Sequence, residues 1–332
     1  MGEALAVHLA GRAAVTDLGR PGMAGHGIPV NGAADQYSAR MANILVGNDE
    51  RAALIEITAT DLVVSASRPA LVAVTGAPAT LTVAGVAHPR WQPLCVDADQ
   101  PVAITQINSG LRAYLAVRGR LDAPRVFGSC APDPVLGVGR WLAEDDRLGV
   151  DSDYEPVSHP LTQPVLRVGD EPPWPSDPWT VDLVEGPDLD FFADPLAVLE
   201  SGEYVVGSRS NHIGIRLEGP RPTRLRDAEI LSRGSPLGAL EVPPVGELLV
   251  LQRGRPITAG YPVVAVVTRW SSSLLGQARP GQRLRLRVRE LDDAVRAHRA
   301  RERQLRDVAR RVRVAFSSLG IAVAHGTQEE RP

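Results

Sequence analysis

Residues 16–48 read TDLGRPGMAGHGIPVNGAADQYSARMANILVGN, a glycine-rich polar loop that changes into an amphipathic pattern. Glycines at this density permit positive φ angles, which lets the backbone come close to a ligand or another chain. Asp35 is a good helix N-cap, the following apolar residues have helical spacing, and Gly47-Asn48 supplies a C-terminal stop. We therefore predict a loop that leads into a short helix, and loops of this kind are where sites usually lie.

Outside this stretch the chain is typical of a mainly β protein. The sequence holds 31 Gly and 28 Pro, and turn signals separate short apolar runs or alternations. Such a pattern favours sandwiches or barrels and disfavours a Rossmann fold. The clearest predicted strands are residues 71–74, 81–83, 114–117, 181–184, 248–251 and 263–268.

The length of 332 residues predicts about two domains. A stretch dense in proline and acid, residues 151–178, is the best candidate for a crossing between two halves, around one plausible strand at 165–168. A short helix is expected near 194–199, and an arginine-rich helix is expected from Glu290. That helix either docks a partner or packs on its own barrel with a solvated outer face. The predicted divisions are 1–160, 161–178 for the crossing, 179–289, 290–318 for the helix, and 319–332 for a disordered tail.

Composition excludes several classes of function. The formal net charge of −3 and the pI near 6.2 give no reason to expect nucleic acid or a membrane as partner. The N-terminal residues lack the features of a signal peptide, and no run approaches the ~18 apolar residues of a membrane span, so we expect a cytoplasmic protein. All 36 Lys+Arg residues are arginine, which rules out a P-loop lysine, a Schiff-base lysine or a biotinylated lysine in this sequence.

Cysteine and histidine give no sign of a metal site. Cys95 and Cys130 stand alone, and the seven histidines are far apart in the sequence, so we expect no metal. Signatures of common hydrolases, zinc enzymes and nucleotide-binding proteins are also missing from the sequence.

Polar residues in glycine turns are the candidates for a site in the first half. Asp17 and Arg20 flank Gly19 at a spacing that suits either binding of a carboxylate substrate or an ion pair that braces the loop. Asp35 is either a helix cap or a catalyst. Glu56 lies among apolar residues, so it needs a partner such as Arg112, and a buried carboxylate of this kind can act as a general acid or base.

The second half offers a parallel group. His212 follows Asn211 and is the best-placed histidine for proton transfer, unless it is an ordinary surface residue. The alternation after it predicts a strand that turns Arg216 and Glu218 to one face. Tyr261 lies beside a tight turn, where it either stacks on a ligand or covers the core.

Taken together, these segments resemble the biotin-dependent carboxyltransferase family. Its members include the C subunit of bacterial 5-oxoprolinase, also called KipA or allophanate hydrolase subunit 2, and the carboxyltransferase region of urea carboxylase. The resemblance runs in order from about residue 5 to 290. The matching segments are DLGRPGMAGHGIPVNGAAD (17–35), NILVGND (43–49), LIEIT (54–58), TGA (75–77), RAYLAVRG (112–119), IGIRLEG (213–219), VPPVG (242–246), AGYP (259–262) and QARPG (277–281).

The resemblance implies two cyclophilin-like β-barrels side by side with a cleft between them. It implies two partners, a KipI-like and a LamB/YcsF-like protein, and the three together open 5-oxoproline to L-glutamate with ATP hydrolysis. It leaves open a biotin-dependent carboxyltransferase acting on urea- or allophanate-type amides, and a non-catalytic regulatory partner of a KipI-like protein. ATP would then be used by the complex, and any biotin would arrive on another protein. The implied catalytic residues are Asp17, Arg20, Asp35 and Glu56, and the implied substrate-binding residues are His26, Asn48, Arg112, His212, Arg216 and Tyr261.

The sequence departs from the family pattern in four places. Residues 128–132 read GSCAP where GSRST is usual, and residues 211–213 read NHI where Asp-Arg-Met is usual. Glu241 replaces a usual Gln, and Gly254 replaces a usual Asp. Because an unpaired buried polar group costs roughly 1–3 kcal/mol, such changes predict either a different amide substrate or the loss of catalysis.

Overall fold

The computed structural model describes residues 3–156, 167–168, 171–226, 230–244, 246–321 and 323. The chain forms two compact units that are interleaved in the sequence. Unit 1 comprises Met1–Gly19, Gln36–Pro172 and Arg303–Pro332, and unit 2 comprises Arg20–Asp35 and Pro173–Glu302. Most of the glycine-rich loop therefore belongs to unit 2, although the residues on both sides of it belong to unit 1.

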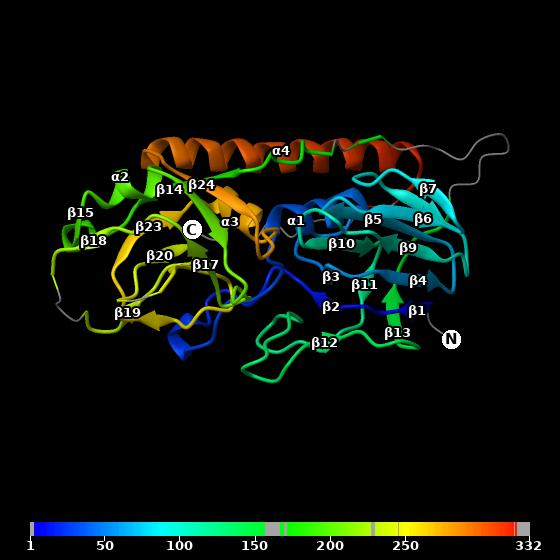
Figure 1. Cartoon of the computed structure of the whole chain (residues 1–332). Helices are drawn as coiled ribbons and strands as arrows, with labels where there is room; N and C mark the ends of the chain where they lie inside the picture. Colours follow the sequence, from blue (N-terminus) through cyan, green and yellow to red (C-terminus); the bar gives the residue numbers. More distant parts are fainter. Residues whose placement is uncertain are drawn as a thin grey trace. The chain divides into compact units, whose positions relative to one another are not determined.

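Unit 1 is built from two antiparallel sheets (Figure 1). The seven-stranded sheet has the order β11-β13-β1-β4-β9-β6-β7, and the six-stranded sheet has the order β12-β2-β3-β10-β5-β8. Apolar residues on both faces of β10 and β5 are buried, as their continuous hydrophobic runs require. The strands are β1 Glu3–Leu9, β2 Ala13–Thr16, β3 Leu54–Thr58, β4 Leu62–Ala66, β5 Ala70–Gly76, β6 Thr80–Val83, β7 Val86–His88, β8 Leu94–Val96, β9 Val102–Thr105, β10 Arg112–Val117, β11 Arg120–Leu121, β12 Arg140–Trp141 and β13 Arg147–Asp151.

The predicted helix after the glycine-rich loop is confirmed as α1, Gln36–Leu45. It packs against β5 and β10, and the apolar residues that define its predicted face are all buried. The turn after the helix contains Gly47, whose φ of 72° lies in the left-handed region that favours glycine. The backbone N–H of Gly47 donates to the carbonyl of Ile44 over 2.9 Å, which closes the last turn.

Unit 2 contains a closed seven-stranded barrel, as predicted for the second half of the chain. Its strand order is β14-β23-β20-β21-β17-β16-β24, and β14 and β24 close the ring as its parallel pair. Alternate residues of these strands fill the interior with apolar side chains, among them Trp179, Tyr204 and Leu284. The barrel strands are β14 Trp179–Glu185, β16 Glu203–Val206, β17 Gly214–Glu218, β20 Ala239–Glu241, β21 Leu248–Leu251, β23 Val263–Val267 and β24 Arg283–Val288.

Smaller elements complete unit 2. Two ribbons pair β15 with β18 and β19 with β22. The predicted helix near 194–199 is confirmed as α2, and α3 was not predicted. The sequence does not indicate α3 because it contains three consecutive serines, which are weak helix formers. At the start of α3, the backbone N–H of Ser271 donates to the hydroxyl of the N-cap residue Thr268. These elements are η1 Ala24–His26, η2 Leu189–Phe191, α2 Pro195–Glu200, α3 Arg269–Leu275, β15 Phe192–Ala193, β18 Thr223–Arg224, β19 Arg233–Gly234 and β22 Thr258–Ala259.

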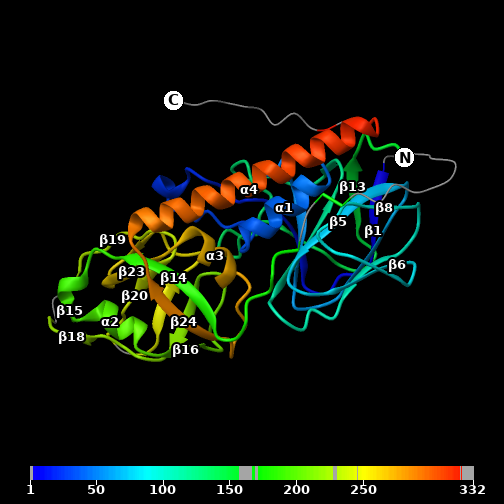
Figure 2. The ribbon, with the colours of Figure 1, turned by 90° about the horizontal axis from the view of Figure 1, so that it is seen from above.

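The predicted C-terminal helix is confirmed as α4, Leu291–Ser318. Its residues up to Glu302 belong to unit 2 and those from Arg303 belong to unit 1. Within unit 1, Figure 2 shows the helix running beside α1. The buried residues of the helix are Leu305, Val308, Val312 and Phe316. Across the described ranges, none of the helices has the length and apolar character that crossing a bilayer requires.

All six strands predicted from the clearest apolar runs are present, as parts of β5, β6, β10, β14, β21 and β23. Part of the predicted crossing at 161–178, half of the strand expected at 165–168, and most of the tail after 319 lie outside the described residues.

Candidate functional site

The candidate site residues are distributed over both units, and each group is described within its own unit. Their local surroundings differ widely, from fully buried hydrogen-bond networks to exposed loops. Asp17, Asn48, Glu56 and Arg112 belong to unit 1, and Arg20, His26, Asp35, His212, Arg216 and Tyr261 belong to unit 2.

Glu56 lies at the centre of a small cluster on neighbouring strands. On β3 it points away from the fully buried Ile55 and Ile57, and the antiparallel register places it directly opposite Tyr114 on β10. The hydroxyl of Tyr114 donates to Glu56 Oε2 over 2.8 Å, and Arg112 Nε donates to Oε1 over 3.3 Å. The expected Glu56–Arg112 pair is therefore confirmed. These donors fix the position of the carboxylate.

Asp17 is almost fully buried and holds a distant loop of unit 1 in place. Its Oδ1 accepts from the Ser129 hydroxyl over 2.5 Å and from the Gly19 amide over 2.8 Å. Its Oδ2 accepts from the Cys130 amide over 2.9 Å and from Arg125 Nη1 over 3.3 Å. Asp17 thus forms its ion pair with Arg125 and braces the loop that contains Ser129 and Cys130, whereas the ion pair considered from the sequence was with Arg20.

Cys130 lies in this network, at one of the positions that depart from the family pattern. Its thiol lies 3.4 Å from Asp17 Oδ2. Burial, and next the negative charge of Asp17, raise the pKa of the Cys130 thiol to about 12. The group therefore stays protonated at neutral pH and is a poor nucleophile.

Asn48 links the end of α1 to the end of β10. Its side-chain nitrogen donates to the carbonyl of Val117 over 2.8 Å, and its side-chain oxygen accepts from the amide of Gly119 over 2.9 Å. Both ends of the amide are therefore engaged with the backbone of unit 1.

The glycine-rich loop is fastened to the barrel of unit 2 through Asn31 and Arg253. The amide of Asn31 donates to the carbonyl of Arg253 over 3.0 Å, and Arg253 Nε donates to the carbonyl of Asn31 over 2.6 Å. Inside the loop, the amide of Arg20 donates to the carbonyl of Val30 over 2.8 Å. Arg20 is only 1% exposed, whereas His26 lies exposed in η1.

Asp35 ends the loop in a buried position. Gln277 Nε2 donates to Asp35 Oδ2 over 2.8 Å, and both residues are almost fully buried. Gln277 belongs to the QARPG segment, which the sequence analysis identified without assigning a role to its glutamine. A buried acid has to be hydrogen-bonded, and that requirement is the signal by which a polar partner could have been sought.

Two departures from the family pattern, His212 and Gly254, are in contact in unit 2. The amide of Gly254 donates to the carbonyl of His212 over 2.9 Å. A Cβ atom at position 254 would lie 2.4 Å from Cδ2 of the His212 ring, well inside van der Waals contact. The glycine therefore leaves the room that the exposed histidine occupies, so the two changes are physically linked.

The remaining predicted residues of unit 2 lie towards the surface. Arg216 and Glu218 share one face of β17, as the alternation predicted. Arg216 Nη1 lies 3.9 Å from Glu247 Oε2, and Arg209 Nη2 donates to Glu247 Oε1 over 2.6 Å. Tyr261 is 44% exposed and is available to a ligand.

Glu241 is a buried carboxyl group that is not among the site residues predicted from the sequence. It lies on β20 with 1% of its surface exposed, and the Ser235 hydroxyl donates to Oε1 over 3.4 Å. Burial raises the pKa of Glu241 to about 7, against the opposing effect of the Ser235 hydrogen bond. A carboxyl group with a pKa near neutrality can both accept and donate a proton. In the described part of the chain, no three His, Cys, Asp or Glu side chains gather as a metal site would require.

The family model for "Carboxyltransferase domain, subdomain A and B" matches residues 26–288. The chain is 31% identical over 304 residues to the 5-oxoprolinase C subunit of Escherichia coli (strain K12), which covers 90% of this chain and 95% of that protein. It is 33% identical over 218 residues to urea amidolyase of Saccharomyces cerevisiae (strain ATCC 204508 / S288c), covering 61% of this chain and only 12% of that protein. The crystal structure of TTHA0988 matches with a TM-score of 0.73 and 32% identity over 86% of this chain. The chain spans about half of that protein, 55% of its length.

Proposed function

Since this chain belongs to the family of the carboxyltransferase domain, subdomains A and B, we propose that it is a subunit of a 5-oxoprolinase-type enzyme. The observation that carries the proposal is the 31% identity to a 5-oxoprolinase C subunit over 95% of that protein's length. In this proposal the chain acts with a KipI-like partner and a LamB/YcsF-like partner. The complex opens 5-oxoproline to L-glutamate and hydrolyses ATP, and the chain alone is inactive.

Glu56 is the group that we assign to proton transfer on the amide. Its carboxylate is held by Tyr114 and Arg112, so it is positioned without being enclosed. Opening an amide requires a proton for the departing nitrogen and removal of a proton from the attacking oxygen, which is work for a fixed carboxyl group. Arg112 is suited to bind the substrate carboxylate because a guanidinium donates through several N–H groups.

The other candidates receive supporting roles in this proposal. Asp17 and Asp35 hold loops through buried hydrogen bonds, and Arg20 belongs to the loop that Asp35 ends. His26, His212, Arg216 and Tyr261 are at least partly exposed and offer polar or aromatic groups to a substrate. Biotin, if a carboxyl transfer takes place, has to be attached outside this sequence, which has no lysine to carry it.

The test is co-expression of the chain with its KipI-like and LamB/YcsF-like partners, followed by measurement of ATP-dependent glutamate release from 5-oxoproline. Glu56→Gln should lower kcat by about 100-fold or more, since general acid–base groups contribute about 10²–10⁴-fold. Glu203→Gln is the control, because Glu203 forms ion pairs only with Arg283 and Arg285 among the residues described and should leave turnover unchanged. Full turnover by the Glu56→Gln complex would show that Glu56 is not required for proton transfer. A wild-type complex without turnover would show that 5-oxoproline hydrolysis is not its reaction.

A biotin-dependent carboxyltransferase is the second candidate, favoured by the 33% identity to a segment of a urea amidolyase. It predicts carboxyl transfer between a biotinylated carrier protein and a urea- or allophanate-type amide. The same purified complex distinguishes the two, because the first proposal requires ATP-dependent glutamate release without any biotinylated protein. A stable complex that performs neither reaction would favour a regulatory binding protein.

A further inference from the structure

The part of α4 that belongs to unit 1 carries a row of exposed arginines beside its buried face. Arg303, Arg306, Arg310 and Arg313 follow one another at intervals of three and four residues, which places them on one side of the helix. We call these four residues the arginine row. The exposed Arg311 lies between them in sequence but falls on another side of the helix.

The charges of the arginine row are poorly balanced. Asp307 pairs with Arg310 over 2.9 Å on the exposed surface of the helix. Arg303, Arg306 and Arg313 have no ion pair with any described residue. Like charges three and four residues apart on a helix repel each other and destabilise it. An external anion that lies along the row would remove this repulsion.

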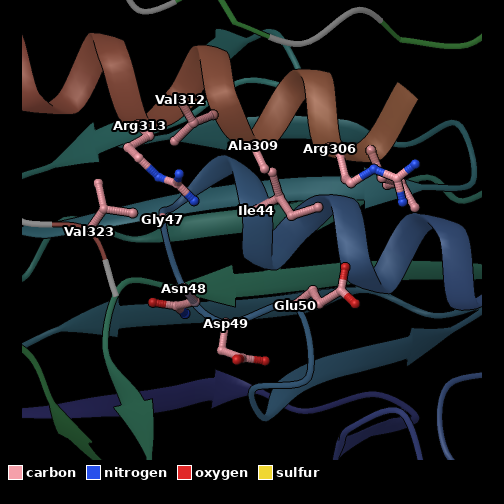
Figure 3. A pocket seen from close by; sticks show the side chains of 11 residues that line it. Ile44, Gly47, Asn48, Asp49, Glu50, Arg306, Ala309, Val312, Arg313 and Val323 are labelled. Carbon is pink, nitrogen blue, oxygen red and sulfur yellow. The ribbon is translucent and has the colours of Figure 1, made fainter. Parts of the chain in front are cut away.

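A pocket of about 150 Å³ opens next to the arginine row (Figure 3). On the α4 side, Arg306 and Arg313 extend on either side of Ala309. The opposite wall comes from the end of α1 and the turn after it, with Ile44 and Gly47 among the residues. Apolar atoms of Leu305, Val312 and Val323 line the pocket as well. A cavity of this order of volume accepts a group about as large as benzene.

The acidic residues of the pocket limit what can bind there. Glu50 is already paired with Arg40 over 2.9 Å. Asp49 is exposed on the wall opposite the arginines, and its Oδ1 accepts from the amide of Arg51 over 2.7 Å. A continuous phosphate backbone would meet Asp49 and Asp307 as well as the arginines, and the chain as a whole is negative. Separate carboxylates with an apolar side chain between them suit this arrangement of charges better.

We propose that the arginine row and the adjacent pocket form a docking surface for an acidic segment of a partner protein. Carboxylates of that segment pair with Arg303, Arg306 and Arg313, and one apolar side chain enters the pocket beside Ala309. The surface lies within unit 1 and is independent of the reaction proposed above, so it is tested on the purified chain alone.

The probe is a fluorescein-labelled 18-residue peptide with glutamates spaced three and four residues apart and one central leucine. Fluorescence anisotropy should detect binding that weakens as NaCl is raised from 50 to about 500 mM, since salt screens exposed charges. Arg306→Gln and Arg313→Gln should each raise the Kd about two- to five-fold, and the double variant about tenfold, as expected for exposed ion pairs. Arg311→Gln is the matched control and should leave the Kd unchanged. Asp49→Asn should lower the Kd because it removes a repelling charge.

The pocket is tested by filling it. Ala309→Met should weaken binding, and replacing the peptide leucine by serine should weaken binding to the wild-type chain but have little further effect on Ala309→Met. Circular dichroism spectra of all variants check that the helix is intact. The proposal is wrong if the peptide does not bind below about 1 mM, if Arg311→Gln weakens binding as much as Arg306→Gln, or if a 16-base-pair DNA duplex binds more tightly than the peptide.

Discussion

Gln277 Nε2 donates a hydrogen bond to Asp35 Oδ2 across 242 positions of the sequence, and both side chains are almost fully excluded from solvent. The bond ties the end of the glycine-rich loop to the QARPG segment within unit 2. It places a carboxylate in the interior and supplies one of the donors that such a group requires.

Replacement of Gln277 by leucine should therefore destabilise the protein. The change removes a donor from a buried carboxylate, and a hydrogen bond to a charged group contributes about 1.5–3 kcal/mol. Urea unfolding followed by circular dichroism measures the free energy of unfolding. Gln282→Leu is a matched control, since Gln282 makes an equally short hydrogen bond of 2.8 Å to Asp177 on the exposed surface. This variant should lose less than about 1 kcal/mol of unfolding free energy. Equal losses of unfolding free energy in the two variants would show that burial does not make the Asp35–Gln277 hydrogen bond more stabilising than an exposed one.

Glu241 predicts a dependence of stability on pH. Burial raises its pKa to about 7 in the folded chain, against a reference value of 4.5. Between these two values the folded state keeps a proton that the unfolded state has lost, so the free energy of unfolding falls as pH rises through this window. Glu241→Gln removes the titrating group and should stabilise the protein by about 2–3 kcal/mol at pH 8, with a much smaller gain near pH 4.5.

Thermal unfolding at pH 5 and pH 8 checks this expectation. The exposed Glu144 provides the control, because Glu144→Gln should shift neither melting temperature. A gain from Glu241→Gln that is the same at both pH values would contradict the titration argument and point instead to improved hydrogen bonding by the amide.

Cys130 should be protected from thiol reagents in the folded protein. It is 2% exposed, and burial beside Asp17 raises the pKa of its thiol to about 12, so little thiolate is present at pH 8. In a Cys95→Ala background, Ellman's reagent should modify Cys130 only at the rate of unfolding. Asp17→Asn should accelerate the reaction, because it removes a nearby negative charge and loosens the loop that contains Ser129 and Cys130. Rapid modification of the native chain would refute the described surroundings of this thiol.

Gly47 should be intolerant of a side chain. Its φ is 72°, and a Cβ atom there would lie 2.9 Å from the Phe316 ring and 3.2 Å from Arg118 Nη1. Gly47→Ala should lower the free energy of unfolding by about 3 kcal/mol. Backbone strain accounts for about 1–2 kcal/mol of this, and displacement of Phe316 on α4 accounts for the rest. Gly85 has a φ of 82° with no atom near its Cβ position, so Gly85→Ala isolates the strain alone. Equal losses in the two variants would mean that Phe316 adjusts without cost.

Local sequence patterns predicted most helices and strands of this fold, whereas contacts between distant residues could not be predicted from such patterns. Period-two alternation and apolar runs gave the strands, and the spacing of Leu305, Val308 and Val312 gave α4. The serines of α3 lack such a pattern, and its start depends on Thr268 and on Ser271, whose hydroxyl accepts from the Asp182 amide. Local propensity cannot reveal a helix that is held by a distant strand.

For the candidate site too, local features of the sequence were predictable and most long-range partners were not. The need of Glu56 for a partner correctly predicted Arg112, because burial of a charge in an apolar strand is visible in the sequence. Arg20 was considered as the ionic partner of Asp17, but Arg125, 108 residues away, takes that place. Neither Arg125 nor Gln277 carries a local signal, since each meets its carboxylate only after the chain has folded.

The pair of hydrogen bonds between Asn31 and Arg253 has a consequence for synthesis on the ribosome. These residues are 222 positions apart. At about 5–20 residues per second, the glycine-rich loop leaves the ribosome roughly 10–45 s before the strands that receive it exist. The ring of unit 2 is delayed further, because β14 has no parallel neighbour until β24 has been translated. The nascent chain must therefore keep the polar loop without its partner while the intervening 222 positions are translated, and keep one edge of β14 open until β24 exists, which makes the synthesis of β24 decisive for avoiding aggregation.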